Sequence, residues 1–228
     1  MKTKFIKFFM VVLFIPLLII PAYPSEASGI STSSEKAREL KQEAAQMIVV
    51  TPSKKSKTTG TMQRYEKRNG KWKKVSTPMK VVIGKKGTGK TKEGDARTPV
   101  GTFRLGTSFG WGTKPTKTKY PFKKATKYDY WIDDAESKDY NKWVRYKGNP
   151  HKKWKSFERL NHPLYKYGVV IRYNEKPIVK GAGSAIFLHV KTSKTKYTLG
   201  CVATSEKNLI KTLKWLDSKK KPIIVIKP

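Results

Sequence analysis

Short runs of β-branched and apolar residues, separated by turn-forming residues, dominate the chain from residue 46 onward. The first run is Met47-Ile48-Val49-Val50, and an Asn69-Gly70 pair between two later runs is a strong signal for a β-hairpin. Runs of the same kind occur at residues 61–65, 71–75, 79–83, 101–105, 168–173, 185–190 and 222–226. The pattern predicts a mainly β domain over residues 46–228, built as a sandwich or a barrel-like pair of sheets.

The segment after residue 204 has the period of a helix instead. Thr204 or Ser205 is placed to cap its first turn. Four apolar residues share one of its faces, namely Leu209, Ile210, Leu213 and Leu216. A short helical stretch is also expected over residues 35–45. It lies in the polar, charged segment 28–45, which we interpret as a linker.

The segment 109–167 is rich in Trp, Tyr, Lys and Asp and shows little clean periodicity. A structureless loop of that length is unusual inside a compact domain. We therefore expect an insertion that folds against the sheet and covers part of it.

Residues 1–27 have the pattern of a signal peptide. Three lysines in the first seven residues precede an apolar run from Phe8 to Ile20, and Ser25-Glu26-Ala27 offers small residues for cleavage. The apolar run is short for a membrane span, which needs about 20 residues. The pattern predicts a secreted protein, with an uncleaved anchor as the alternative.

The charge of the chain is strongly positive, with 50 Lys and Arg against 16 Asp and Glu and a net charge of +34. Such a charge indicates a polyanionic neighbour. For an exported protein, anionic cell-wall polymers fit better than nucleic acid, for which the chain carries no motif. The lysines are spread along the chain, so a generally basic solvated surface is the alternative.

Cys201 is the only cysteine, and it follows His189 by twelve residues. A lone cysteine in an exported protein has no partner for an internal disulfide, which makes it a candidate reactive thiol. His189 ends an apolar strand and is a candidate base for the thiol, while a turn before a helix presents backbone N–H groups for an oxyanion. The alternative is a buried structural cysteine with an unrelated histidine. His151 and His162 lack metal-ligand spacing, so no metal site is predicted.

Three segments resemble L,D-transpeptidases of the YkuD type. Residues 181–190 followed by Thr198-Leu199-Gly200-Cys201 are similar to the family's strand-end histidine and its Ser/Thr-x-Gly-Cys motif. Residues 93–103 are similar to its Gly-Asp-x-x-Thr-Pro-x-Gly-x-Phe segment, and the closing helix and strand match as well. The resemblance covers most of residues 46–228. Leu199 and Ala203 depart from the commonest pattern, which has His and then Arg or Asn at these places.

The resemblance implies an L,D-transpeptidase-like β-sandwich that acts on the peptide stems of peptidoglycan, without a metal or organic cofactor. Cys201 would attack the carbonyl of the third stem residue, a diamino acid, and expel the terminal D-Ala. His189 would take the thiol proton, and backbone N–H groups near Gly200 and Cys201 would hold the oxyanion. From the residues themselves, Thr198 would hydrogen-bond within the turn and fix the thiol's loop, with a solvent-facing loop threonine as the alternative. An amine of another stem would then give a cross-link, and water would give a trimmed tripeptide. An L,D-carboxypeptidase and a non-catalytic basic wall-binding protein therefore stay open as alternatives.

Four further residues are expected to bind the substrate. Gly183 would let the substrate approach the backbone, although shaping the turn is the alternative. Tyr130, Trp131 and Glu158 of the insertion would wall the cleft, with acids to receive the ammonium of the diamino acid. The alternative for this segment is a satellite aromatic core.

Overall fold

One continuous β-sheet forms the body of the protein, in a computed structural model that describes residues 33–228. Its strands are β1 (Gln46–Ser53), β2 (Ser56–Arg68), β3 (Lys71–Lys74), β4 (Met79–Val82), β5 (Gly101–Gly110), β6 (Phe122–Lys124), β10 (Gly168–Ile171), β11 (Phe187–Val190), β12 (Val202–Thr204) and β13 (Ile223–Ile226). The predicted signal peptide, residues 1–27, lies outside the described residues. No helix within residues 33–228 is long and apolar enough to cross a membrane.

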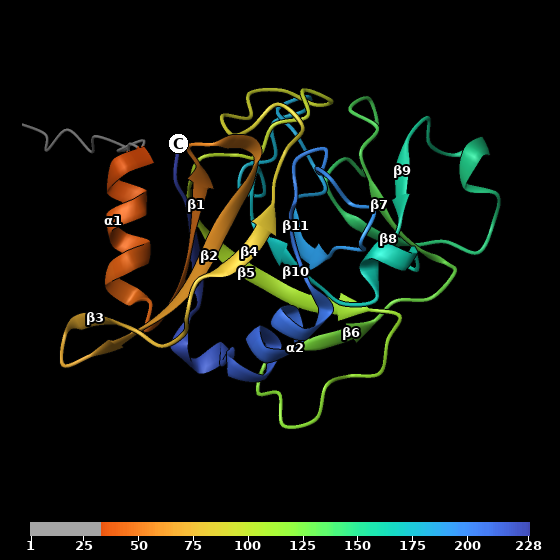
Figure 1. Cartoon of the computed structure of the whole chain (residues 1–228). Coiled ribbons are helices and arrows are strands. Elements are labelled where there is room, and N and C mark those ends of the chain that lie inside the picture. Colours follow the sequence, from red (N-terminus) through yellow and green to blue (C-terminus); the bar gives the residue numbers. More distant parts are fainter. Residues whose placement is uncertain (1–32) are drawn as a thin grey trace, which may run out of the picture. The chain divides into compact units, whose positions relative to one another are not determined.

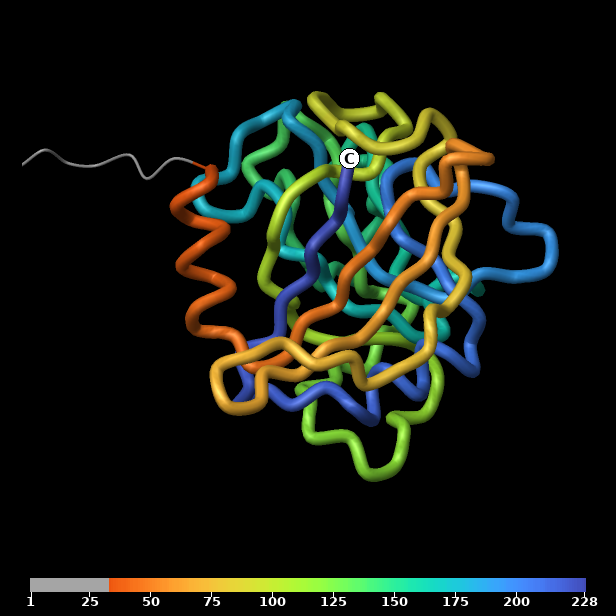
Figure 2. The backbone as a smooth tube through the Cα atoms, turned by 60° about the vertical axis from the view of Figure 1, so that its left-hand side comes forward, coloured from red at the N-terminus to blue at the C-terminus, as the bar shows by residue number. Residues whose placement is uncertain are grey.

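The sheet closes on itself. Among the described residues its order is β1-β13-β5-β10-β11-β12-β4-β2, and β2 also pairs with β1 along most of its length. Figure 2 shows the C-terminal strand lying beside the orange strands near the start of the domain, which is the parallel pairing of β13 with β1. The mainly β, sandwich-like or barrel-like class predicted from the sequence is confirmed.

Local sequence signals account for several elements. Asn69 and Gly70 both have positive φ, 49° and 73°, and they turn β2 into β3 as the Asn-Gly signal predicted.

The predicted strand over 185–190 begins later, at Phe187. Ala185 lies before it with φ of 52°, and its N–H donates to Asn141 Oδ1. The sequence analysis missed β12, which is only three residues long and lies between Cys201 and the helix that follows.

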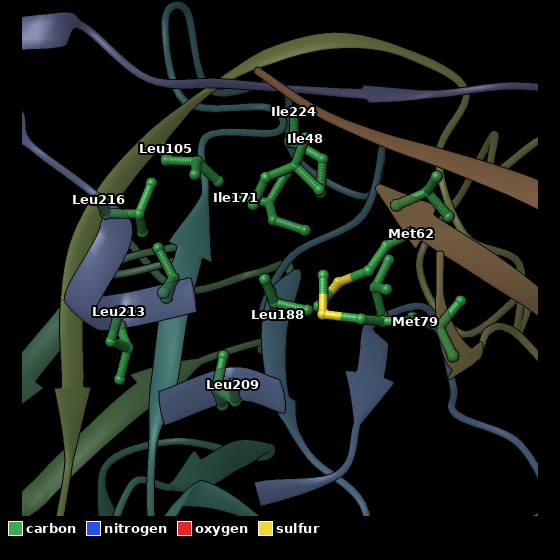
Figure 3. Close-up of a cluster of buried hydrophobic side chains, with 14 of the residues drawn as sticks. Ile48, Met62, Met79, Leu105, Ile171, Leu188, Leu209, Leu213, Leu216 and Ile224 are labelled. Carbon is green, nitrogen blue, oxygen red and sulfur yellow. The ribbon is translucent and has the colours of Figure 1, made fainter. Parts of the chain in front are cut away.

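That helix is α2 (Glu206–Trp215), and it covers one opening of the closed sheet (Figure 1). Ser205 caps it by accepting a hydrogen bond from the Asn208 N–H. Leu209, Leu213 and Leu216 are buried in the main core, where they meet inward-facing residues of the strands (Figure 3). Each such leucine contributes about 1.5–3 kcal/mol through burial. The short helix η3 (Ser218–Lys220) then leads into β13.

The segment interpreted as a linker contains α1 (Ser33–Glu43), close to the expected helical stretch. Leu40 and Ala44 are buried there against Met47 of β1 and Ile223 of β13. The helix lies beside the outer face of these strands in Figure 1. The boundary between linker and domain at residue 46 stays a prediction.

The insertion folds as a second, smaller sheet of β7 (Asp129–Ile132), β8 (Trp143–Arg145) and β9 (Phe157–Arg159), with the short helices η1 (Pro150–Lys152) and η2 (Pro163–Tyr165). Figure 1 shows it on the side of the main sheet away from α1. Aromatic contacts attach it to the main sheet: Trp143 packs edge-on against Phe109 of β5, and Trp131 against Phe187 of β11. It thus folds against the sheet, as expected.

Candidate active site

Strands β11 and β12 place the candidate nucleophile and base on one side of the sheet. The parallel register pairs Leu188 with Val202, so Cys201 lies beside Phe187, one position earlier on each strand. Because side chains alternate along a strand, Leu188 enters the main core while Phe187 and His189 point to the opposite face. Cys201 and His189 line the same cavity, which has a volume of about 390 Å³.

The thiol of Cys201 is held by backbone groups. Sγ accepts a hydrogen bond from the Phe187 N–H at 3.3 Å and donates to the Ala185 carbonyl at 3.2 Å. Among the described residues no hydrogen bond joins the thiol to His189. Burial, together with nearby Glu158, raises the pKa of Cys201 to about 12, against opposing effects of the Phe187 N–H and the Lys90 charge. The thiol of this candidate nucleophile is therefore neutral at rest.

His189 is buried and also neutral at rest. Its Nδ1 lies 2.8 Å from the Val190 carbonyl, and its ring packs edge-on against Tyr165 with centroids 5.4 Å apart. Burial lowers the pKa of His189 to about 4, although the neighbouring Val190 and Leu164 carbonyls raise it. When Nδ1 donates to Val190, the lone pair is on Nε2, which is the state that a general base needs.

Two threonines fix the turn that carries the thiol. Thr198 Oγ1 donates to the Cys201 carbonyl at 2.6 Å and accepts from the Gly200 N–H at 3.2 Å. Thr98 Oγ1 donates to the same carbonyl at 3.3 Å and accepts from the Gly84 N–H. Gly200 has a positive φ of 154°, and a Cβ there would lie 3.2 Å from the backbone oxygen of Arg97, so this position favours glycine. The sequence analysis named Thr98 only within the family-like segment 93–103 and missed this contact with Cys201.

Cys201 is not followed directly by a helix, which corrects one expectation. Strand β12 intervenes, and α2 begins five residues after Cys201. The N-terminus of α2 therefore does not supply the backbone N–H groups at the thiol. Those groups belong to the turn itself, where the Gly200 N–H already donates to Thr198.

Of the four residues expected to bind substrate, the structure brings only Glu158 to the cavity. Both backbone groups of Gly183 form hydrogen bonds within the protein. Its N–H donates to the Tyr140 hydroxyl, and its carbonyl accepts from the Asn174 side chain. Tyr130 is buried against Trp154 and Phe157 within the insertion.

Trp131 is buried as well, but it supports the site from behind. Its Nε1 donates to Asn141 Oδ1 at 2.9 Å, and the same oxygen accepts from the Ala185 N–H. Ala185 in turn accepts the thiol hydrogen bond. Trp131 thus stabilises the backbone that holds Cys201 without lining the cavity.

Other residues of the cavity wall were not singled out from the sequence. Glu93, Asp133, Tyr165 and the exposed Tyr197 line it. The exposed Leu199, which the sequence analysis named only as a departure from the family pattern, lines it as well. Tyr165 joins two parts of the site, since it packs on His189 and its hydroxyl donates to Glu158 Oε2 at 3.1 Å. Within residues 33–228 no group of His, Cys, Asp and Glu is placed to hold a metal ion.

Behind the thiol turn lies a buried ion pair. Lys90 Nζ donates to Asp95 Oδ1 at 2.7 Å, and their side chains are 1% and 7% exposed. The Lys90 side chain fills the space beside Gly183 and Gly200. A Cβ added to Gly183 would lie 2.6 Å from Lys90 Cε, and a Cβ added to Gly200 would lie 3.7 Å from the same atom. The pair therefore supports both turns that flank the thiol.

A family model of the L,D-transpeptidase catalytic domain (YkuD) matches residues 46–225, well over half of the chain. The chain belongs to this family. The resemblance predicted from the sequence is confirmed. The L,D-transpeptidase family acts on the peptide stems of peptidoglycan, and both candidate catalytic residues fall within the matched range.

This L,D-transpeptidase domain is similar to the solved structure of Bd1075 from Bdellovibrio bacteriovorus, with 15% identity and a TM-score of 0.42 over 80% of this chain and 48% of that chain. It is also similar to the helical cell shape determining protein Pgp2 from Campylobacter jejuni, with 18% identity and a TM-score of 0.42 over 86% of this chain and 55% of that chain. The chain thus spans about half the length of these proteins. Comparison with curated protein sequences finds no match.

Proposed function

We propose that the protein is a secreted cysteine L,D-transpeptidase that cross-links peptidoglycan stems through a thioester on Cys201. The observation that carries the proposal is the shared cavity of Cys201 and His189, inside a domain of this family. The thiol, held between two backbone groups, faces space for a peptide. Its presence also argues against a non-catalytic wall-binding protein, which would not need a nucleophile.

The resting site holds both groups neutral, so the first step moves a proton as it forms a bond. The thiol proton passes to His189 Nε2 while Sγ attacks the carbonyl carbon of the third stem residue. Because the Gly200 N–H is already bonded to Thr198, we propose the Cys201 N–H as a donor to the oxyanion. Collapse of the tetrahedral adduct expels D-Ala, whose amine takes the proton from His189.

The second step regenerates the thiol. An amine of another stem attacks the thioester carbon, and His189 takes the amine proton and returns it to Sγ. The product is a cross-link between two stems. Attack by water in place of the amine gives a tripeptide instead, which is the carboxypeptidase alternative.

We also propose that the signal peptide directs the protein out of the cell and that its basic surface keeps it at the anionic wall. The net charge of +34 supports this proposal.

The proposal is tested by incubating the chain from residue 28 onward with tetrapeptide muropeptides and following the products by mass spectrometry. Loss of D-Ala with new dimers supports a transpeptidase, and tripeptide without dimers supports a carboxypeptidase. Cys201→Ala is the control, and it should abolish both products while leaving the thermal transition nearly unchanged. Product formation by Cys201→Ala, or no product from the wild type, would refute the proposed chemistry.

A further inference from the structure

One side chain of the insertion, Asn141, holds the backbone group that accepts the hydrogen bond of the thiol. Asn141 Oδ1 accepts from the Ala185 N–H at 3.2 Å and from Trp131 Nε1 at 2.9 Å. The carbonyl of the same Ala185 accepts from Cys201 Sγ at 3.2 Å. Ala185 therefore connects the amide of Asn141 to the thiol.

The amide of Asn141 uses both of its ends. Its Nδ2 donates to the carbonyls of Tyr173 and Asn174, at 3.1 and 2.7 Å, while its oxygen accepts from two N–H groups. A single orientation of the amide satisfies all of these partners, because the oxygen cannot donate and the nitrogen cannot accept. Asn141 is buried, so solvent has little access to these bonds. The side chain therefore holds Ala185 against the segment that follows β10.

The backbone is in the left-handed region at both ends of this contact. Asn141 has a φ of 55°, and Ala185 has a φ of 52°. Asparagine adopts this region more readily than alanine, for which it is a strained conformation. Such strain persists only where the surrounding contacts enforce it, and the hydrogen bond from the Ala185 N–H to Asn141 is one that does so. In this conformation the Ala185 carbonyl meets Sγ of Cys201.

The two backbone groups that hold Sγ are themselves held in different ways. The Phe187 N–H belongs to β11, whose pairing with β10 keeps it in place. Ala185 lies before the start of β11, so the position of its carbonyl depends on the contact with Asn141. The approach to Ala185 is held similarly, because the Gly183 N–H donates to the hydroxyl of Tyr140, the residue before Asn141. Consecutive residues of the insertion thus hold the segment that leads into β11.

We propose that Asn141 is a positioning residue for Cys201, which aims the Ala185 carbonyl at the thiol and so fixes where Sγ lies before it attacks. This inference rests on the proposed function, because it explains how the insertion readies the nucleophile of that reaction. Misplacing an attacking atom by about 1 Å slows a reaction by about a hundredfold. The insertion therefore contributes to the reaction through Asn141, although Asn141 is not among the described residues that line the cavity.

The S–H stretching band of the resting protein tests the inference without requiring turnover. Cys201 is the only cysteine of the chain, so the infrared spectrum contains one such band, and Cys201→Ala identifies it. A hydrogen bond donated by the thiol weakens the S–H bond and lowers the frequency of the band. In Asn141→Gly we expect the band to move to higher frequency, because the Ala185 carbonyl no longer meets the thiol. Glycine suits the φ of 55° at this position, so the change removes the amide without adding backbone strain.

A milder variant and a matched control accompany this measurement. Trp131→Phe removes one donor to Asn141 Oδ1 but keeps an aromatic ring against Phe187, so it should shift the band in the same direction by less. Trp154→Phe is the matched control, since it removes an indole N–H that donates to Asp139 within the same insertion. It should leave the band unchanged.

Acylation by a tetrapeptide stem is the second measurement. We expect Cys201 to be acylated about tenfold to a hundredfold more slowly in Asn141→Gly than in the wild type, at a temperature where both are folded. An unchanged band in Asn141→Gly, or an equal loss of rate in Trp154→Phe, would overturn the inference. If Asn141→Gly does not fold, Trp131→Phe decides by the same two measurements.

The wild-type rate separates this inference from the proposed function. If the wild type is acylated and Asn141→Gly is acylated equally fast, the positioning role fails and the thioester chemistry stands. If the wild type is not acylated, the proposed function fails, and the positioning role fails with it.

Discussion

Replacing Lys90 by Met should destabilise the protein more than any exposed charge substitution. The change keeps most of the side-chain volume between Gly183 and Gly200 but removes the ammonium that pairs with Asp95. Removing one partner of a buried ion pair costs about 3–5 kcal/mol, because the other charge stays buried. Asp95 keeps three backbone partners, the N–H groups of Thr91, Lys92 and Arg97, so we expect a value near the lower end of this range.

Urea unfolding at pH 7 measures the effect, with Arg172→Met as the matched control. Arg172 pairs with Glu175 through side chains that are 40% and 30% exposed, and such a pair contributes about 0–1 kcal/mol. A loss for Lys90→Met no larger than that of Arg172→Met would refute the reasoning. The double variant Lys90→Met/Asp95→Asn should be more stable than Lys90→Met alone, since it removes the unpaired charge.

The same pair predicts how stability depends on pH. Asp95 is buried, which opposes ionisation, but its hydrogen bonds to Lys90 and to backbone N–H groups lower its pKa from 3.8 to about 2. Because the pKa of Asp95 is lower in the folded protein than in the unfolded chain, ionised Asp95 stabilises the fold at pH values above about 4. This contribution to the free energy of unfolding is lost as the pH falls from about 4 to about 2. The contribution is about 2 kcal/mol, and Asp95→Asn should remove this part of the acid sensitivity. An unchanged pH profile in Asp95→Asn would contradict the assignment.

Three further predictions concern the thiol, its turn and the surface. Because burial raises the pKa of Cys201 to about 12, its alkylation rate should keep rising up to about pH 10, and a plateau near neutrality would contradict a neutral resting thiol. Thr198→Val removes the 2.6 Å bond to the Cys201 carbonyl and should cost about 1–3 kcal/mol in urea unfolding while slowing acylation of Cys201. Thr192→Val, at an exposed threonine, is the control. A loss of stability in Thr192→Val as large as that in Thr198→Val would refute the role of the Thr198 hydrogen bond. High salt should release the protein from isolated walls if its charge holds it there, whereas retention would indicate a specific binding site.

Local patterns in the sequence were sufficient for much of the fold. The Asn69-Gly70 turn, the β-branched runs and the helical spacing after Ser205 each depend on residues close together in the chain. Strand β12 was missed for the opposite reason. Its three residues form a strand only because β11 and β4, distant in sequence, pair with it on either side.

The candidate nucleophile Cys201 and its candidate base His189 were singled out from the sequence because a motif marks them, and the structure places both at one cavity. The cavity wall was predicted only in part. Glu158 of the insertion was expected there, but Glu93, from the segment before β5, and Asp133 of the insertion were not. Tyr130 and Trp131 show a second limit. All four residues of β7 are buried, with neighbouring side chains in different clusters, so the strand has no exposed face to present to a substrate. Lys90 carried no signal among so many lysines, although it is buried beside the thiol turn.

Intact-protein mass spectrometry after a brief incubation with tetrapeptide stems tests the central claim most directly. The account predicts an adduct on Cys201 with the mass of the stem without its terminal D-Ala, because the thioester forms as D-Ala leaves. The adduct should be absent from Cys201→Ala and should disappear when an amine acceptor is added. An adduct that maps to another residue, or stems trimmed by Cys201→Ala, would contradict the account.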